Sequence, residues 1–283
     1  MLANSFWYFS LVFISLFIFI LIYKKSNHFR KDLAVYFFAA GLSFFGEFVV
    51  LILFDAYNYY PRVFTESWPD NVFGSLISQA IIIPTVLMAI AAFQIRTRGV
   101  LPIIFAIALI EELFLWLGIY KHNWWKTWYT IALLLLGTFI MKWWRRKLTN
   151  SSKTIQFLTI YMVFNTFFHI ISYFMSTVFK LSWYSIGWFE SIYKDHIILN
   201  ILIGVSITIP MTAIVLFSYN YLTLSALFIF IIIIDSVLIK LGLMHVIDDK
   251  VVIAAPIIYL IVVSVVKRLN DYFFSEKGSC LGE

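Results

Sequence analysis

The sequence predicts an all-α polytopic membrane protein with about nine transmembrane helices, one anchor helix plus two parallel four-helix repeats. Of the 283 residues, 62% are hydrophobic and only 13% are charged, whereas soluble domains carry about 25% charged residues. The apolar residues form long runs, many near the roughly 20 residues that cross a bilayer as a helix. The second half of the chain also repeats the residue pattern of the first.

Nine apolar runs are predicted to cross the membrane. A window of about 19 residues places them at 6–23, 33–54, 71–93, 99–120, 127–143, 155–178, 196–217, 221–243 and 250–266. The first run lacks a basic segment before it and a small-residue cleavage site, so we expect a retained anchor and not a removed signal peptide. No linker rich in Pro, Gly or Ser divides the chain. We expect a single membrane domain made of an anchor helix (6–23), a first unit (33–147), a second unit (153–268) and a cytoplasmic tail (269–283).

Lys and Arg cluster in the loops on one side of these runs. The main clusters are KKSNHFRK (24–31), Arg96 with Arg98, and KWWRRK (142–147). Positively charged loops stay cytoplasmic, which predicts a multi-pass protein of the cell membrane with its N-terminus outside and its C-terminus in the cytoplasm. The net charge of +6 follows from this topology, so the expected partner is the lipid bilayer and not nucleic acid.

Cysteine content and motifs exclude several kinds of site. Cys280 is the single cysteine, so an intrachain disulfide is impossible and a cysteine metal site is not expected. The HExxH, GxSxG, P-loop and dinucleotide-binding motifs are absent. We therefore predict no metal and no cofactor, and the sequence assigns no catalytic residue.

A shift of about 125 residues aligns the two predicted units. The segment 35–60 pairs with 160–185, and IEELFLWLG (110–118) pairs with IDSVLIKLG (234–242) after small gaps. Because each unit has an even number of helices, both copies have the same orientation, which predicts a pseudo-two-fold axis along the membrane normal. The aligned pairs include Tyr36 and Tyr161, Tyr59 and Tyr184, Asp70 and Asp195, Pro84 and Pro210, and Glu111 and Asp235.

Four ionisable residues fall at one depth in the helices that run outward. Each lies about 12–14 residues from the cytoplasmic end of its helix, or roughly 18–21 Å at 1.5 Å per residue. Ionisable groups inside spans usually face the bundle interior or water, so we expect a polar layer shared by both units. The alternative is that the acids are protonated and only hold helices together. The four residues are Glu47, Glu111, His169 and Asp235.

Two carboxylates are adjacent in the fourth run. Neighbouring residues on a helix diverge by about 100°, so Glu111 and Glu112 cannot both reach one point. The match of Glu111 with Asp235 makes Glu111 the residue expected to face inward, and Glu112 is expected to face another helix. The aromatic residues that follow, in HNWWKTWY (122–129), are typical of an interfacial belt.

Polar residues and prolines in neighbouring spans are predicted to support the polar layer. A proline inside a span frees a backbone carbonyl and often marks a kink beside a cavity, although a simple packing kink remains the alternative. Lys240, one turn beyond Asp235, either pairs with it or extends to the membrane surface. The predicted supporting residues are Gln79, Pro84, Asn200, Pro210 and Lys240.

The pattern E-x6-G-I-Y-x-H-N-W-x-x-W resembles an uncharacterised family of small membrane proteins of about five helices from spore-forming Gram-positive bacteria. The resemblance covers residues 1–147 and would make the second unit a diverged extra copy that lacks the Tyr-His-Asn-Trp part. It implies a topology and no chemistry. The residues that carry it are Glu111, Gly118, Ile119, Tyr120, His122, Asn123, Trp124 or Trp125, and Trp128, with Glu47, Asp70, Asn71 and Pro84 upstream.

The sequence thus favours a protein with a polar intramembrane site that binds or transports a small solute, ion or proton. One alternative is an intramembrane enzyme acting on a lipid or isoprenoid, with Glu111 as general acid or base. A third is a non-catalytic membrane scaffold or sensor whose acids serve only packing. Oligomeric state is left open by the sequence.

Overall fold

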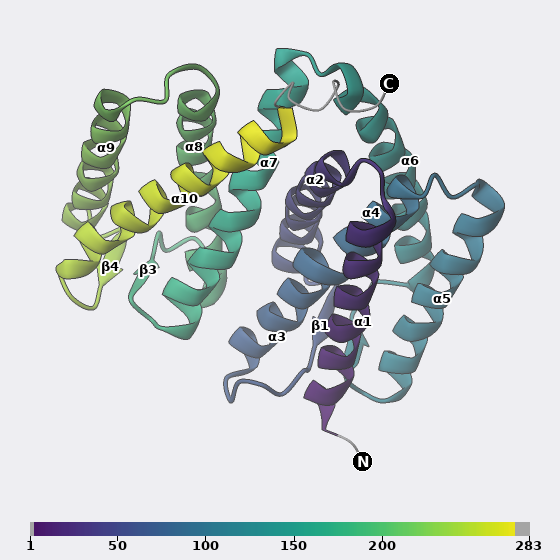
Figure 1. Ribbon diagram of the computed structural model, residues 1–283. Coiled ribbons are helices and arrows are strands. Elements are labelled where there is room, and N and C mark those ends of the chain that lie inside the picture. The colour runs from purple at the N-terminus through teal and green to yellow at the C-terminus, as the bar shows by residue number, and fades with distance from the viewer. Residues whose placement is uncertain (1–2, 275–283) are drawn as a thin grey trace. The chain divides into compact units, whose positions relative to one another are not determined.

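The computed structural model describes residues 3–274 and divides into two compact units, Met1–Ile155 (unit 1) and Gln156–Glu283 (unit 2). Helices make up most of the chain, with a few very short strands (Figure 1). Cys280 lies outside the described residues. That the two units form a single domain stays a prediction.

The described part of unit 1 contains five long helical segments, two of which include a stretch of π-helical geometry. Its two three-residue strands pair with each other in antiparallel fashion. The elements are α1 (Asn4–Lys25), α2 (Phe29–Glu47), the π-helix η1 (Phe48–Leu53), β1 (Tyr57–Tyr59), α3 (Ser67–Leu76), the π-helix η2 (Ile77–Ile82), α4 (Ile83–Ala92), α5 (Thr97–Trp116), β2 (Tyr120–His122), α6 (Thr127–Lys147) and the short 3-10 helix η3 (Leu148–Asn150).

Unit 2 has four helical segments and a second antiparallel strand pair. A capping box starts α9, because the Asn220 side chain accepts from the Thr223 amide and the Thr223 hydroxyl accepts from the Asn220 amide. The elements are α7 (Lys153–Ser172), which begins just before the unit boundary, the π-helix η4 (Tyr173–Val178), β3 (Ser182–Tyr184), α8 (Ile192–Phe217), α9 (Tyr221–Lys240), β4 (Met244–Val246) and α10 (Lys250–Phe274).

Eight helical segments of the described chain are long and apolar enough to cross a membrane. Many of their large side chains are exposed, among them Phe13 of α1 at 70% and Phe105 of α5 at 61%, which suits a protein surrounded by lipid. The predicted class, an all-α polytopic membrane protein, is therefore confirmed. The predicted span 127–143 is the 21-residue helix α6; it is not among the eight, and its end, KWWRRK, carries four basic residues.

The last helix is longer than the apolar run that predicted it. The prediction ended this span at residue 266, but α10 continues to Phe274. Its final turns contain an i,i+4 ion pair between Lys267 Nζ and Asp271 Oδ1, at 2.6 Å, which supports a helix beyond the apolar run. Residues 269–274, predicted as tail, are thus helical.

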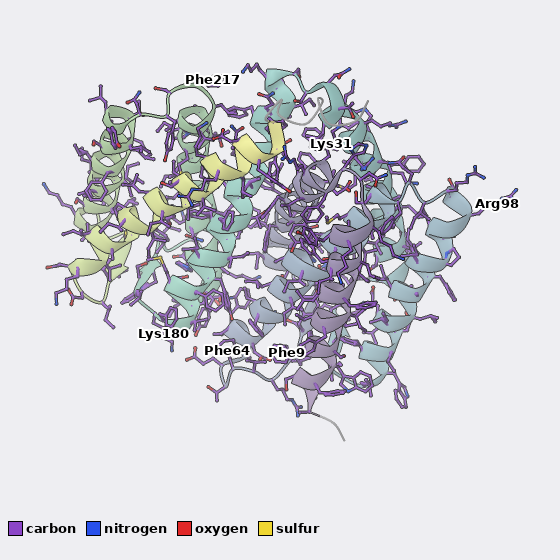
Figure 2. The ribbon with its side chains drawn as sticks, in the orientation of Figure 1. Phe9, Lys31, Phe64, Arg98, Lys180 and Phe217 are labelled. Atoms are coloured by element: carbon purple, nitrogen blue, oxygen red, sulfur yellow. The ribbon has the colours of Figure 1, made fainter. Side chains whose placement is uncertain are left out.

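The strand pairs fix the chain at one end of each unit. In unit 1, Tyr57 lies opposite His122, and Gly118 turns the chain between α5 and β2 with a φ of +67°. That conformation favours glycine because it has no Cβ. We call this the hairpin end of unit 1. Lys31 and Arg98 lie toward the opposite, basic end, far from Phe9 and Phe64 (Figure 2).

At the basic end of unit 1, α2 and α6 are tied together. Arg145 Nε of α6 lies 2.5 Å from Asp32 Oδ1 of α2, and the Asp32 side chain is fully buried. On the same two helices, the rings of Phe38 and Trp144 stack with centroids 3.8 Å apart. A buried charge pair of this kind fixes the relative position of the two helices more than it adds stability.

Candidate binding cavity

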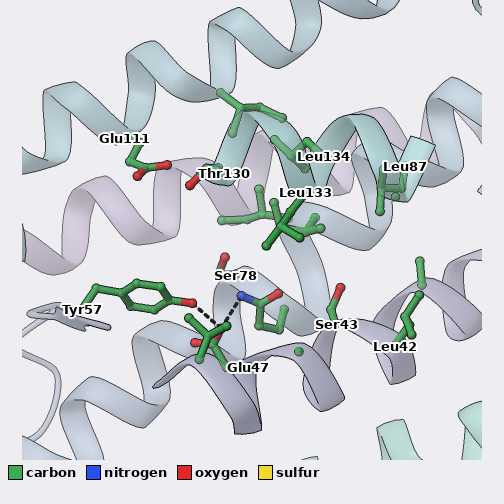
Figure 3. A pocket seen from close by; sticks show the side chains of 18 of the residues that line it. Leu42, Ser43, Glu47, Tyr57, Ser78, Leu87, Glu111, Thr130, Leu133 and Leu134 are labelled. Carbon is green, nitrogen blue, oxygen red and sulfur yellow. Dashed lines mark hydrogen bonds between the residues drawn. The ribbon is translucent and has the colours of Figure 1, made fainter. Parts of the chain in front are cut away.

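Unit 1 encloses a cavity of about 550 Å³ (Figure 3). This volume lies within the range of small-molecule sites, roughly 300–1,000 Å³. Its lining residues come from every helical segment of unit 1 between Tyr8 and Met141, and from both strands. We call it the unit 1 cavity.

Glu47 lies on one side of the cavity. Its Oε2 accepts hydrogen bonds from the Tyr57 hydroxyl, at 2.6 Å, and from Gln79 Nε2, at 2.9 Å (Figure 3). The other oxygen, Oε1, is buried and accepts no hydrogen bond from the residues the structure describes. A buried polar atom without a partner costs about 1–3 kcal/mol, so a donor brought to Oε1 would stabilise the Glu47 carboxyl group.

The π-helical segments position these groups. Glu47 is the last α-helical residue before η1, and Gln79 lies within η2. A π-helical turn is wider than an α-helical turn and changes the direction in which the following side chains point; such turns are frequent at functional sites. Apolar periodicity gives no sign of them in the sequence.

Glu111 lies on the opposite side, near Thr130 (Figure 3). Its Oε1 is 2.8 Å from Nε2 of His122, and the two side chains are 10% and 16% exposed. The pair forms because the turn at Gly118 brings strand β2 back beside the end of α5. Glu112, in contrast, is exposed and accepts a hydrogen bond from the Thr127 hydroxyl.

Aromatic side chains form the hairpin end of the cavity. The rings of Tyr59, Tyr120 and Trp125 surround Tyr57 with centroids 5.3–5.5 Å from it, and all four residues line the cavity. Burial, followed by the charge of Glu47, raises the pKa of Tyr57 well above its ordinary value. The phenol therefore stays protonated and donates to Glu47.

The rest of the cavity is apolar and reaches the surface of unit 1. Its walls include Leu42 and Leu87, together with the α6 residues from Leu133 to Met141. Three lining residues are themselves exposed: Gly46 of α2, and Leu133 and Leu136 of α6, the two leucines at 51% and 54%. Part of the cavity lining, on α2 and α6, is therefore at the surface of unit 1.

The structure places the predicted site residues in three groups. Glu47, Gln79 and Glu111 line the unit 1 cavity, whereas Glu112 does not. Pro84 is buried, and the carbonyl four residues before it, that of Ala80, accepts a hydrogen bond from the Tyr36 hydroxyl at 2.7 Å, which favours the packing interpretation of this proline. The remaining residues, His169, Asn200, Pro210, Asp235 and Lys240, belong to unit 2.

In unit 2 the predicted residues have separate environments. Nδ1 of His169 lies 2.7 Å from the Asn165 carbonyl, and Asn200 accepts from the Ser172 hydroxyl at 2.9 Å. Asp235 is buried and Lys240 is exposed. Burial chiefly raises the pKa of Tyr184 well above its ordinary value, and nearby Tyr259 and Asp235 raise it further. The polar layer shared by both units stays a prediction.

Pro210 lies inside the continuous helix α8, whereas Pro84 follows the π-helix η2 at the start of α4. The two prolines that the sequence aligned therefore have different local geometry. The residues described also contain no group of three or more His, Cys, Asp or Glu that could hold a metal ion.

The sequence assigned another role to Trp125, which lines the cavity, and to His122, which contacts the lining residue Glu111. Trp125 was predicted as part of an interfacial belt, but it is 8% exposed, lines the cavity and donates from Nε1 to the Thr130 hydroxyl at 2.9 Å. That prediction is wrong for Trp125, whereas Trp128, at 56% exposure, fits it. His122 was assigned to the same belt and instead binds Glu111. Gly118, between Glu111 and His122, was the one feature of the sequence that indicated that the chain turns back.

Comparison of the chain with protein families, with characterised proteins and with solved structures finds no match. The motif that carries the family resemblance nonetheless has a structural role at the hairpin end. Asn123 Nδ2 donates to the Asp55 carbonyl and Trp124 Nε1 to the Phe54 carbonyl, both at 2.7 Å. These bonds tie the segment after β2 to the end of η1.

Proposed function

We propose that this integral membrane protein binds a small molecule with an apolar body and a polar head in the unit 1 cavity. The observation that carries the proposal is the arrangement of the lining, in which two carboxyl groups at the hairpin end face a cavity with otherwise mostly apolar walls. Binding sites for small molecules commonly combine apolar walls with a few convergent polar groups. Transport of the bound molecule is the extension of this function that the sequence favours.

The exposed lining residues of α2 and α6 support a second candidate function. A molecule that enters beside Gly46 and Leu133 would pass apolar surface, as a lipid or isoprenoid does. An intramembrane enzyme for such a substrate would use Glu111 as general acid or base, with His122 as its hydrogen-bond partner. The enzymatic function would use the same cavity as the binding function and would add a chemical reaction of the bound molecule.

The proposed orientation follows the distribution of charge. Lys24, Lys25, Arg98 and the basic end of α6 all belong to the basic end of unit 1, and positive loops remain cytoplasmic. The hairpin end would then face outward, with the N-terminus outside and the C-terminus in the cytoplasm of a bacterial cell. The two carboxyl groups would lie on the outer side of the membrane midplane.

We also propose that the two units are copies of one ancestral unit. Equivalent hydrogen bonds, 125 residues apart, support this. Asp70 accepts from the amides of residues 62–64, and Asp195 accepts from those of residues 186–189. The amide of Tyr59 donates to Asn71 and that of Tyr184 to His196, both at 2.8 Å.

The repeat gives a reason for expecting the ligand in unit 1. Phe168 of unit 2 aligns with Ser43, which lines the unit 1 cavity, and Gly204 aligns with Gln79. The ring of Phe168 occupies the space beside Gly204, 2.2 Å from where a Cβ would lie. If the units are copies, unit 2 has a phenylalanine at the position of the smaller, cavity-lining Ser43 of unit 1.

The test uses the purified full-length protein in nanodiscs with octan-1-ol as the probe. Octanol should raise the thermal unfolding temperature of the wild type, because a ligand that binds only the folded state stabilises it. Ser43→Phe, which copies the residue of unit 2, should abolish this shift. Val49→Phe is the matched control, since Val49 is 43% exposed and does not line the cavity. An equal octanol shift in Ser43→Phe and wild type, or none in wild type, would contradict the proposal.

A further inference from the structure

We infer that the polar head of the ligand is a primary or secondary ammonium group held between Glu47 and Glu111. This inference rests on the proposed function and specifies the class of ligand. Three observations carry it: the sign of the charge in the lining, the unfilled acceptor on Glu47, and the aromatic rings beside both carboxyl groups.

The lining of the unit 1 cavity carries acidic groups and no basic side chain. Glu47 and Glu111 are its ionisable carboxyl groups, and none of its residues, all within the described chain, is Lys, Arg or His. Two carboxyl groups in a largely apolar cavity favour a cation over an anion, because an anion would be both desolvated and repelled. A carboxylate or phosphate head is therefore disfavoured.

None of the hydrogen-bond partners of Glu47 in the described chain carries a positive charge that would compensate a carboxylate there. Both donors to Oε2, Tyr57 and Gln79, are neutral groups, and so is the Ser75 hydroxyl beside the same carboxyl group. Glu111, in contrast, has His122 beside it. Glu47 lines the cavity, and its Oε1 is buried and accepts no hydrogen bond from the described residues. An N–H donor that carries positive charge would satisfy this oxygen and compensate the charge in one contact.

Because Glu47 Oε1 lacks a hydrogen-bond donor among the described residues, ammonium groups with an N–H are favoured over those without one. A quaternary ammonium has no N–H and would leave Oε1 without a hydrogen bond, whereas a primary or secondary ammonium supplies one. The rings of Tyr57, Tyr59, Tyr120 and Trp125 would contact the adjoining methylene groups, and their faces favour a nearby cation. The leucines of α6 would contact the apolar body.

The experiment compares four octyl compounds on the full-length protein in nanodiscs, with thermal unfolding as the readout. The compounds are octylamine, octan-1-ol, octyltrimethylammonium and octanoate. We expect octylamine to bind about ten-fold more tightly than octanol, as a charge-assisted hydrogen bond allows, and octyltrimethylammonium and octanoate to bind more weakly than octylamine. Glu47→Gln should remove the preference for octylamine and leave the octanol shift in place.

Glu112→Gln is the matched control, since Glu112 is the exposed neighbour of Glu111, and it should keep the preference for octylamine. An octylamine affinity equal to that of octanol overturns the ammonium inference while the proposed function stands. A failure of octanol and octylamine alike to shift the unfolding temperature overturns the proposed function itself. If octyltrimethylammonium binds as tightly as octylamine, the inference that the head is a cation stands. The inference that the head donates an N–H to Glu47 is then overturned.

Discussion

Glu111 and His122 are eleven residues apart in sequence, yet their side chains share a hydrogen bond of 2.8 Å. On one continuous helix that separation would place them about 16 Å apart. The chain instead leaves α5 at Trp116, turns at Gly118 and returns as β2, which pairs with β1. The contact therefore depends on the turn, and it links an acid of the membrane span to the hairpin end.

We predict that removing either partner of this pair destabilises the protein. His122→Ala should lower the free energy of unfolding by about 1–3 kcal/mol, because it leaves the Glu111 carboxyl group buried without its partner. Glu111→Gln should cost a similar amount, and the double variant should cost less than the sum. The measurement is unfolding in mixed micelles titrated with dodecyl sulfate. Glu112→Gln, which alters an exposed pair, should stay within about 0.5 kcal/mol of wild type.

The turn itself gives the second prediction. Gly118→Ala should destabilise the protein by about 1–3 kcal/mol, since a residue with a Cβ is strained at a φ of +67° even though the space around it is open. Gly46→Ala is the matched control, because its surroundings are also open and it lies in helical conformation within α2. There alanine should stabilise by about 0.5–1 kcal/mol. Equal effects at the two glycines would contradict this account.

The proposed duplication gives a third prediction, which concerns two aligned aspartates. Asp195→Ala should destabilise unit 2 by about 3 kcal/mol or more, because it removes an acceptor shared by four backbone amides. Asp70→Ala should do the same in unit 1, where three amides lose their acceptor. Hydrogen exchange resolved by peptide would assign each effect to its unit. Loss of protection in only one of the two loops would argue against equivalent roles.

The amino-acid sequence predicts the helices well because each is a long apolar run, and Glu47 and Glu111 stand out because they interrupt such runs. It does not reveal the strand pairs, because Tyr57 and His122 are 65 positions apart and three-residue strands carry no pattern of their own. Nor does it reveal the roles of Tyr57 and Trp125. Aromatic residues at the end of a span are typical of an interfacial belt, and only the paired strands turn these two toward the cavity.

The last prediction concerns the hydroxyl of Tyr57 and its effect on stability, first at neutral pH and then at alkaline pH. At neutral pH, Tyr57→Phe should cost about 1–3 kcal/mol, because a second acceptor site on Glu47 loses its donor. Tyr120→Phe is the control, since its ring also lines the cavity but its hydroxyl is not the donor to Glu47, and it should cost less.

The effect at alkaline pH follows from the raised pKa of Tyr57. In the unfolded chain this tyrosine has its ordinary pKa of about 10, so above that pH it ionises while the folded form keeps its proton. Above a pH of about 10 the folded state therefore binds more protons than the unfolded state. The free energy of unfolding then decreases as the pH rises further. Unfolding measured between pH 8 and pH 11, a range of about three units, should show this decline in wild type and a shallower one in Tyr57→Phe. An equally steep decline in Tyr57→Phe would show that Tyr57 is not among the groups whose ionisation is suppressed by folding.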